Sequence, residues 1–220
     1  MKTKIRLARS AAVLGIGACM LTLPSLAQDC PELVGRWPYG PTVAVAVAGD
    51  YAYYGSGTAL MVADVSDAAL PQVVGGVVLP RMISDVAVSG IYAYVVDDEN
   101  GLRVIDVSTP SSPSEVGSVS TPVGGAYGVA VGGGYAYVAN QSKGLRVVDV
   151  DPPSSPAEVG FIDAPDNSLD VEVSGGYAYV AQYNDGIRVL DVSTPSAPAA
   201  SPDRASASPS FRLNAAIALS

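Results

Sequence analysis

The sequence predicts an all-β fold, namely a β-propeller of about four blades in which each blade is a four-stranded antiparallel sheet. The tripeptide Tyr-Ala-Tyr occurs four times, at intervals of 41, 43 and 42 residues, and it begins at Tyr51, Tyr92, Tyr135 and Tyr177. A second marker has intervals of 42, 43 and 42 residues and consists of Asp64, Asp106, Asp149 and Asp191. A period of about 40 to 45 residues fits a propeller blade or a helical repeat. Alternating β-branched and aromatic residues between Gly and Pro turns indicate strands.

The second unit shows the four expected strands most clearly. Strand D is expected at Gln72–Leu79, strand A at Ile83–Gly90, strand B at Tyr92–Asp98 and strand C at Gly101–Ser108. An Asn-Gly pair before strand C is a favoured hairpin turn. Strand A would lie nearest the propeller axis, and the tyrosines of strand B would fill the space between blades as it widens outward. The repeated aspartates at the ends of strand C are expected to bond backbone amides in Asx turns.

Residues 1–27 have the pattern of a signal peptide. Four basic residues precede an apolar run from Ala11 to Leu23, and the small residues Ser25 and Ala27 then mark a cleavage site. We therefore expect an exported protein, located in the periplasm, on the cell surface or outside the cell. No later stretch is apolar enough for a transmembrane segment.

The two cysteines bear on anchoring and on disulfides. The alternative to cleavage after Ala27 is a lipid anchor at Cys19, because Ile16–Cys19 resembles a bacterial lipobox. After cleavage only Cys30 remains, so an internal disulfide is excluded and its role stays open.

The expected mature chain is strongly acidic. Cleavage removes four of the twelve basic residues and none of the twenty-one acidic ones, so the formal net charge changes from −9 to −13. Nucleic acids and anionic membranes are bound through basic patches, so this charge argues against both. The simplest explanation of the negative charge is that an acidic surface keeps an exported protein soluble.

Three stretches resemble LVIVD repeats, which are found in exported and surface proteins of bacteria and archaea. They are LRVIDVSTPSSPSEVG, LRVVDVDPPSSPAEVG and IRVLDVSTPSAP, each preceded by Tyr-Ala-Tyr-Val and a hairpin turn. The resemblance covers Pro31 to about Pro198 and implies a β-propeller with an interaction-type role and no catalytic residues to transfer. The first unit departs from the pattern in LMVADVSDAAL, which lacks the Arg and the Thr-Pro.

The ends of the expected propeller region, residues 31–198, suggest how it closes. Pro31–Pro38 aligns with strand D of later units, whereas the last unit lacks strand D and runs into an Ala/Ser/Pro-rich tail, residues 199–220, that we expect to be disordered. The N-terminal strand is therefore expected to complete the last blade and close a four-bladed ring. The alternative is a truncated chain of a larger propeller.

Variable loops mark the candidate binding surface. The A–B turns and C–D connections barely change between units, whereas the D–A and B–C loops vary and emerge on one edge, which we call the loop face. Its candidate partner-binding residues are Tyr39, Arg81, Asp97, Asp98, Glu99, Tyr127, Lys143, Tyr183 and Asp185. The alternative is that unconstrained hairpin tips simply vary.

Carboxylates near the expected axis form a second candidate site. The residues seven positions before each Tyr-Ala-Tyr are Ala44, Asp85, Gly128 and Asp170. In a four-bladed ring Asp85 and Asp170 would face each other across the channel, with Glu172 one position deeper. Oxygen-only ligands favour calcium or magnesium over zinc. The alternative is that water and backbone amides solvate the carboxylates separately.

The sequence offers little for enzymatic chemistry. It contains no histidine, which excludes Ser-His-Asp and Cys-His nucleophile systems and His-ligated metals. We expect a non-enzymatic exported propeller that binds a protein or another ligand through the loop face. The alternatives are a carboxylate-based hydrolase and a cation-stabilised structural module.

Overall fold

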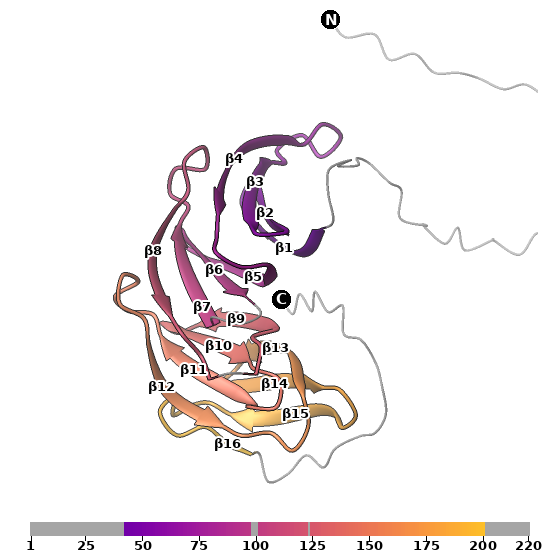
Figure 1. The fold of residues 1–220 in the computed structure, drawn as a ribbon, viewed down its shortest axis with the longest axis vertical. Helices are drawn as coiled ribbons and strands as arrows, with labels where there is room; N and C mark the ends of the chain where they lie inside the picture. The colour runs from indigo at the N-terminus through magenta and orange to yellow at the C-terminus, as the bar shows by residue number, and fades with distance from the viewer. Residues whose placement is uncertain (1–41, 98–100, 123, 201–220) are drawn as a thin grey trace, which may run out of the picture. The chain divides into compact units, whose positions relative to one another are not determined.

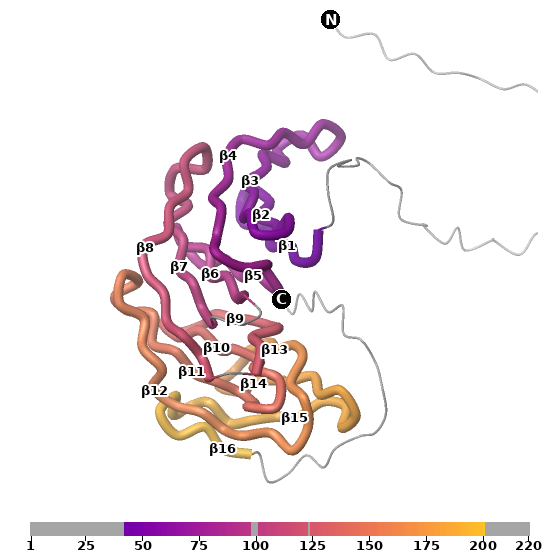
Figure 2. The backbone as a smooth tube through the Cα atoms, in the orientation of Figure 1, coloured from indigo at the N-terminus to yellow at the C-terminus, as the bar shows by residue number. Residues whose placement is uncertain are grey.

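The computed structural model describes residues 42–97, 101–122 and 124–200, which form four four-stranded antiparallel sheets (Figure 1). Strand order follows chain order in every sheet, so each sheet is a meander. The chain leaves the fourth strand of one sheet and enters the first strand of the next, as the tube in Figure 2 shows. The all-β fold with four-stranded blades is therefore confirmed.

The sixteen strands have the following bounds. The first sheet contains β1 (Thr42–Ala48), β2 (Tyr51–Ser56), β3 (Ala59–Asp64) and β4 (Gln72–Val78). The second contains β5 (Ile83–Ser89), β6 (Tyr92–Asp97), β7 (Gly101–Asp106) and β8 (Ser114–Val119). The third contains β9 (Gly128–Gly132), β10 (Tyr135–Ala139), β11 (Leu145–Asp149) and β12 (Ala157–Ile162). The fourth contains β13 (Ser168–Ser174), β14 (Tyr177–Gln182), β15 (Gly186–Asp191) and β16 (Ala199–Ala200).

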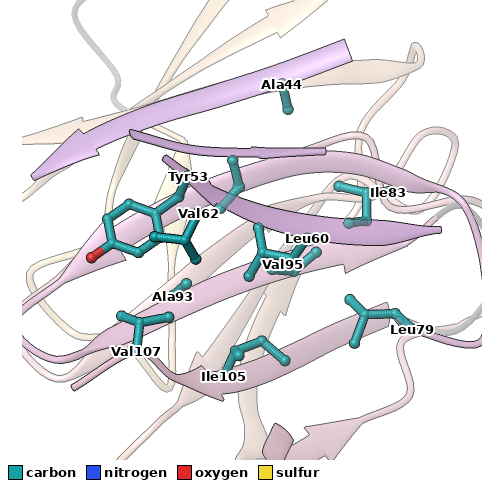
Figure 3. Close-up of a cluster of buried hydrophobic side chains, with 11 residues drawn as sticks. Ala44, Tyr53, Leu60, Val62, Leu79, Ile83, Ala93, Val95, Ile105 and Val107 are labelled. Atoms are coloured by element: carbon teal, nitrogen blue, oxygen red, sulfur yellow. The ribbon is translucent and has the colours of Figure 1, made fainter. Parts of the chain in front are cut away.

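Each hydrophobic core is shared by two neighbouring sheets. Figure 3 shows the first core, in which Tyr53 and Leu60 of the first sheet pack against Val95 and Ile105 of the second. A second core joins the second and third sheets, and a third core joins the third and fourth. We call the side of a sheet that packs on the preceding sheet its leading face, and the side that packs on the following sheet its trailing face.

The second tyrosine of each Tyr-Ala-Tyr lies on a trailing face. Tyr53, Tyr94 and Tyr137 are each 5% exposed, so three of the four tyrosines fill the space between sheets as the sequence predicts. Burial of the ring raises the pKa of all three hydroxyls. The fourth, Tyr179, is 37% exposed because no following sheet covers it among the described residues.

Glycines on the fourth strands let neighbouring sheets approach. A Cβ added at Gly117 would lie 2.3 Å from the carbonyl oxygen of Pro153 in the next sheet, and one at Gly75 would lie 2.2 Å from that of Pro110. Gly160 has the same environment. A side chain at these positions would overlap backbone atoms, so the repeated glycine is a packing requirement.

The expected ring closure is not seen in the described part of the chain. Pro31–Pro38, the expected closing strand, lies outside the described residues. The last unit does supply a short fourth strand, contrary to the prediction, because β16 pairs with Leu190 and Asp191. The signal sequence and both cysteines also lie outside the described residues, and no helix within these residues is long and apolar enough to cross a membrane.

Candidate functional site

The loop face consists of the connections β4–β5, β8–β9 and β12–β13 together with the hairpins at the ends of the second strands. Five predicted partner-binding residues lie on it with exposed side chains, and they are Arg81, Tyr127, Lys143, Tyr183 and Asp185. Tyr183 is the most open aromatic side chain among the described residues, with 66% of its surface exposed. Tyr39, Asp98 and Glu99 lie outside the described residues.

Asp97 was predicted as part of this surface, but the structure buries it completely. Its carboxylate accepts a hydrogen bond from Arg103 Nε at 2.9 Å. A second nitrogen of Arg103 lies 2.8 Å from the carboxylate of Glu115 on β8. Buried charges require such partners. Asp97 is therefore a structural residue that holds the β6–β7 hairpin, and it does not belong to the candidate binding surface.

A polar residue ends the second strand of three sheets and directly follows it in the third sheet, and the sequence analysis missed its role. The four residues are Ser56, Asp97, Asn140 and Gln182. Asn140 Nδ2 donates to the carbonyl of Pro122 at 3.0 Å, which ties the β8–β9 connection to the neighbouring hairpin. Gln182 lies in the equivalent place, with Nε2 3.5 Å from the carbonyl of Asp166. The signal in the sequence is a polar side chain five positions after each first tyrosine.

The hairpin that carries Tyr183 is held by several hydrogen bonds. The backbone N–H of Tyr183 donates to the carbonyl of Asn167 at 2.9 Å. The Asp166 carboxylate accepts from the backbone N–H of Asn184 and from Asn184 Nδ2, the latter at 3.2 Å. The bonds from Asn184 lower the pKa of Asp166, so this carboxylate is ionised at neutral pH. The exposed ring of Tyr183 is therefore presented on an ordered hairpin.

Arginines on the third strands support the same edge. Arg146 is 5% exposed and one of its nitrogens lies 3.0 Å from the Asp163 carboxylate in the β12–β13 connection. Its guanidinium carbon lies 4.6 Å from the centre of the Phe161 ring. Arg188 of the next sheet donates to the carbonyl of Asp163 at 2.9 Å. Arg146 and Arg188 thus both hold the β12–β13 connection of the loop face.

The predicted axial carboxylates make backbone contacts. Asp85 accepts hydrogen bonds from the backbone N–H of Val86 at 2.8 Å and from that of Val129, in the neighbouring sheet, at 2.9 Å. Burial raises the pKa of Asp85 to about 6, and the nearby carboxylates of Asp170 and Glu172 act in the same direction, while the two N–H groups oppose them. Asp85 is consequently a group that clamps two sheets together and resists ionisation.

The other two predicted metal ligands remain at the surface. Asp170 and Glu172 are exposed, and one oxygen of Asp170 accepts from the backbone N–H of Val171 at 2.8 Å. Nowhere in the described ranges do three or more His, Cys, Asp or Glu side chains gather closely enough to hold a metal ion. The contacts of Asp85 favour the alternative in which backbone amides solvate these carboxylates.

The repeated aspartates lie at the ends of the third strands, away from the loop face. Asp64, Asp106 and Asp191 each accept from the backbone N–H two residues later, at 2.9, 2.8 and 2.9 Å. Asp149 does the same at 3.0 Å. Asx turns at these positions were predicted and are confirmed, which assigns these residues to the scaffold.

Comparisons with known proteins agree with this architecture. The model of the LVIVD repeat matches residues 39–78, 80–121, 123–164 and 166–201, and each match covers one sheet. No curated protein matches the chain.

Two crystal structures of designed proteins are similar in fold. The computationally designed Ika4 protein has a TM-score of 0.61 and 11% identity, over 74% of this chain and 99% of that chain. The computationally designed Ika8 protein has a TM-score of 0.57 and 9% identity, over 70% of this chain and 47% of that chain. The chain therefore spans about half the length of Ika8.

Proposed function

Because the chain belongs to the LVIVD repeat family, we propose that it is an exported, non-enzymatic β-propeller scaffold that binds a protein partner through its loop face. The observation that carries this proposal is the Tyr183 hairpin. A 66% exposed aromatic ring on a hairpin fixed by hydrogen bonds loses little conformational entropy when a partner covers it.

The surroundings of Tyr183 resemble the composition of binding surfaces. Tyr127 and Met82, which are 38% and 62% exposed, lie on the same edge as the charged side chains of Arg81 and Lys143. Aromatic residues, methionine and arginine are enriched at protein interfaces, where aromatic anchors commonly dominate the binding energy. This mixture of residues supports a protein partner over a nucleic acid, as does the acidic net charge.

A catalytic role receives no comparable support. Both oxygens of Asp85 accept backbone hydrogen bonds, one of them from the neighbouring sheet, so its contacts are those of a structural group. Burial raises the pKa of Asp85 to about 6, a value that a general acid of a hydrolase would also need. The arrangement therefore favours the binding function.

Binding is tested by comparing matched variants in an affinity pull-down from the exported fraction. Wild-type protein, Tyr183→Ala and Ile91→Ala serve as baits, because Ile91 is 51% exposed but lies on a turn at the opposite edge. We expect Ile91→Ala to capture the same partner as wild type, and Tyr183→Ala to weaken its binding by at least about tenfold. Equal capture by all three baits would refute the role of the loop face.

Export is tested independently of binding. We expect the protein in the exported fraction to begin at Gln28, as determined by mass spectrometry of its N-terminal peptide. A chain that retains Met1 and stays in the cytoplasm would contradict export, and an N-terminus at a lipid-modified Cys19 would show the anchored alternative.

A further inference from the structure

The three interfaces between sheets repeat one pattern, and the two outermost faces are its unpaired halves. In each interface, a valine on the leading face of one sheet packs in the core that also contains the second tyrosine of the preceding sheet. Val86, Val129 and Val171 are 5%, 5% and 4% exposed, whereas the equivalent Val45 of the first sheet is 63% exposed. Tyr179 is the matching exposed tyrosine on the fourth sheet.

The exposure extends over both faces. On the first sheet, Val43 and Val47 are 60% and 66% exposed beside Val45. On the fourth sheet, Tyr177 and Ile187 are each 40% exposed. Large apolar side chains clustered on one face mark an interaction surface. In each of the three internal interfaces a trailing face packs on a leading face. The exposed trailing face of the fourth sheet and the exposed leading face of the first sheet are therefore complementary to each other.

A hydrogen-bond pattern along the first strands leads to the same pairing. Asp85 of the second sheet uses one oxygen for its own Val86 N–H and the other for the N–H of Val129 in the third sheet. Val129 follows Gly128, which has no side chain to accept that bond. Asp170 of the fourth sheet makes the bond equivalent to the first, to its own Val171.

The residue that corresponds to Val129 on the first sheet is Val45. It follows Ala44, which also has no acceptor in its side chain. Continuing the pattern therefore places the second oxygen of Asp170 against the N–H of Val45 on the sheet that covers it. The proposed pairing thus offers the second oxygen of Asp170 the same kind of donor that Asp85 has in the neighbouring sheet.

We propose that the trailing face of the fourth sheet packs on the leading face of the first sheet of a second copy, and that two copies form a head-to-tail ring of eight sheets. Both faces are exposed, so no segment of the same chain within residues 42–97, 101–122 and 124–200 covers them. Head-to-tail contacts form rings when the rotation closes. Two copies give eight blades, at the upper end of the usual range of about four to eight, whereas three copies would exceed it.

One residue opposes this packing and thereby sharpens the test. Glu172 occupies the position that is Ala46, Ala87 and Ala130 in the other sheets. Its carboxylate would lie close to apolar side chains in the new interface, which weakens association. Replacement of Glu172 by alanine restores the residue of the internal interfaces, so it should tighten the dimer.

The pairing of faces is tested by cross-linking between different chains. In a Cys30→Ser background, the variants Val45→Cys and Tyr179→Cys are mixed and treated with a short bis-maleimide. We expect cross-linked dimers in the mixture and none in either variant alone, because each face meets only the opposite face. In the double variant Val45→Cys, Tyr179→Cys, a cross-link that forms only within single chains would show that one chain closes on itself, and would overturn the proposal. Absence of any cross-link would overturn it as well.

The assembly is tested by sedimentation equilibrium of the purified chain and its variants. We expect twice the monomer mass for wild type. Both interfaces lose a tyrosine in Tyr179→Ala, so we expect the dissociation constant of the dimer to rise at least about a hundredfold. Glu172→Ala should dissociate about tenfold less readily, and Ile91→Ala should match wild type. A monomer at all concentrations, a larger assembly, or an unchanged dimer in Tyr179→Ala would each refute the proposed ring.

Discussion

Raising the pH should destabilise the fold through Asp85. Its native pKa is about 6, against an ordinary value of 3.8, so between these values the native state binds more protons than the unfolded state. The free energy of unfolding therefore falls as the pH rises. The difference of about 2 pH units, at about 1.36 kcal/mol per unit, amounts to about 3 kcal/mol in full. About 2 kcal/mol of this develops between pH 4.5 and 7.5, and residual hydration of the half-buried side chain reduces it further.

Urea denaturation at pH 4.5, 5.5, 6.5 and 7.5 measures this effect. Asp85→Asn keeps the shape of the side chain but cannot ionise, so its stability should vary less over the same range. Asp170 is exposed as a whole residue, but its carboxylate lies against Gly128, and the resulting desolvation raises its pKa, so the double variant Asp85→Asn, Asp170→Asn should show the smallest slope. The Asx-turn carboxylates of Asp64, Asp106 and Asp191 have lowered pKa values, and their contribution is lost only at more acidic pH. Wild-type stability that stays constant or increases toward pH 7.5, or an unchanged slope in Asp85→Asn, would refute the reasoning.

Three substitutions test the packing, each by urea denaturation. Gly117→Ala should lower the free energy of unfolding by about 2 kcal/mol or more, because its Cβ would meet a backbone oxygen at 2.3 Å. At Gly132 the nearest atom would lie 3.4 Å from the added Cβ, so Gly132→Ala should lower it by less than about 1 kcal/mol. Arg103→Met should cost about 3 kcal/mol because it removes the ion pair with the buried Asp97; a loss below about 1 kcal/mol would contradict this role. Tyr137→Ala should cost about 3 to 5 kcal/mol, and a near-neutral result would show that the ring does not support the core.

The sheets could be predicted from the sequence because their interactions are mostly local. Each strand pairs with the next strand along the chain, so alternation and turn residues determine both its existence and its partner. The same holds for Asp64, whose hydrogen bond reaches only two residues ahead. The role of the second tyrosine also followed from local pattern, since Tyr94 and Tyr137 occupy identical places in successive repeats.

The misassigned and missed features depend on contacts that no local pattern encodes. Asp97 stands beside a variable hairpin and resembled a surface residue, but its burial follows from Arg103 across the hairpin. The second partner of Asp85 is Val129, 44 residues away and in another sheet. The short β16 lies in an Ala/Pro-rich segment whose composition predicted no strand, and it forms by pairing with β15.

The sharing of each core by two sheets has a consequence for local opening of the chain. The second and third sheets each contribute to two cores, whereas the first and fourth contribute to one. In a linear array whose units contact only their neighbours, the free energy of opening a unit depends on how many neighbours it has. In a single chain that is not assembled into the proposed ring, amide hydrogens of β2 and β14 should therefore exchange with solvent before those of β6 and β10, so that the chain frays from both ends toward its middle.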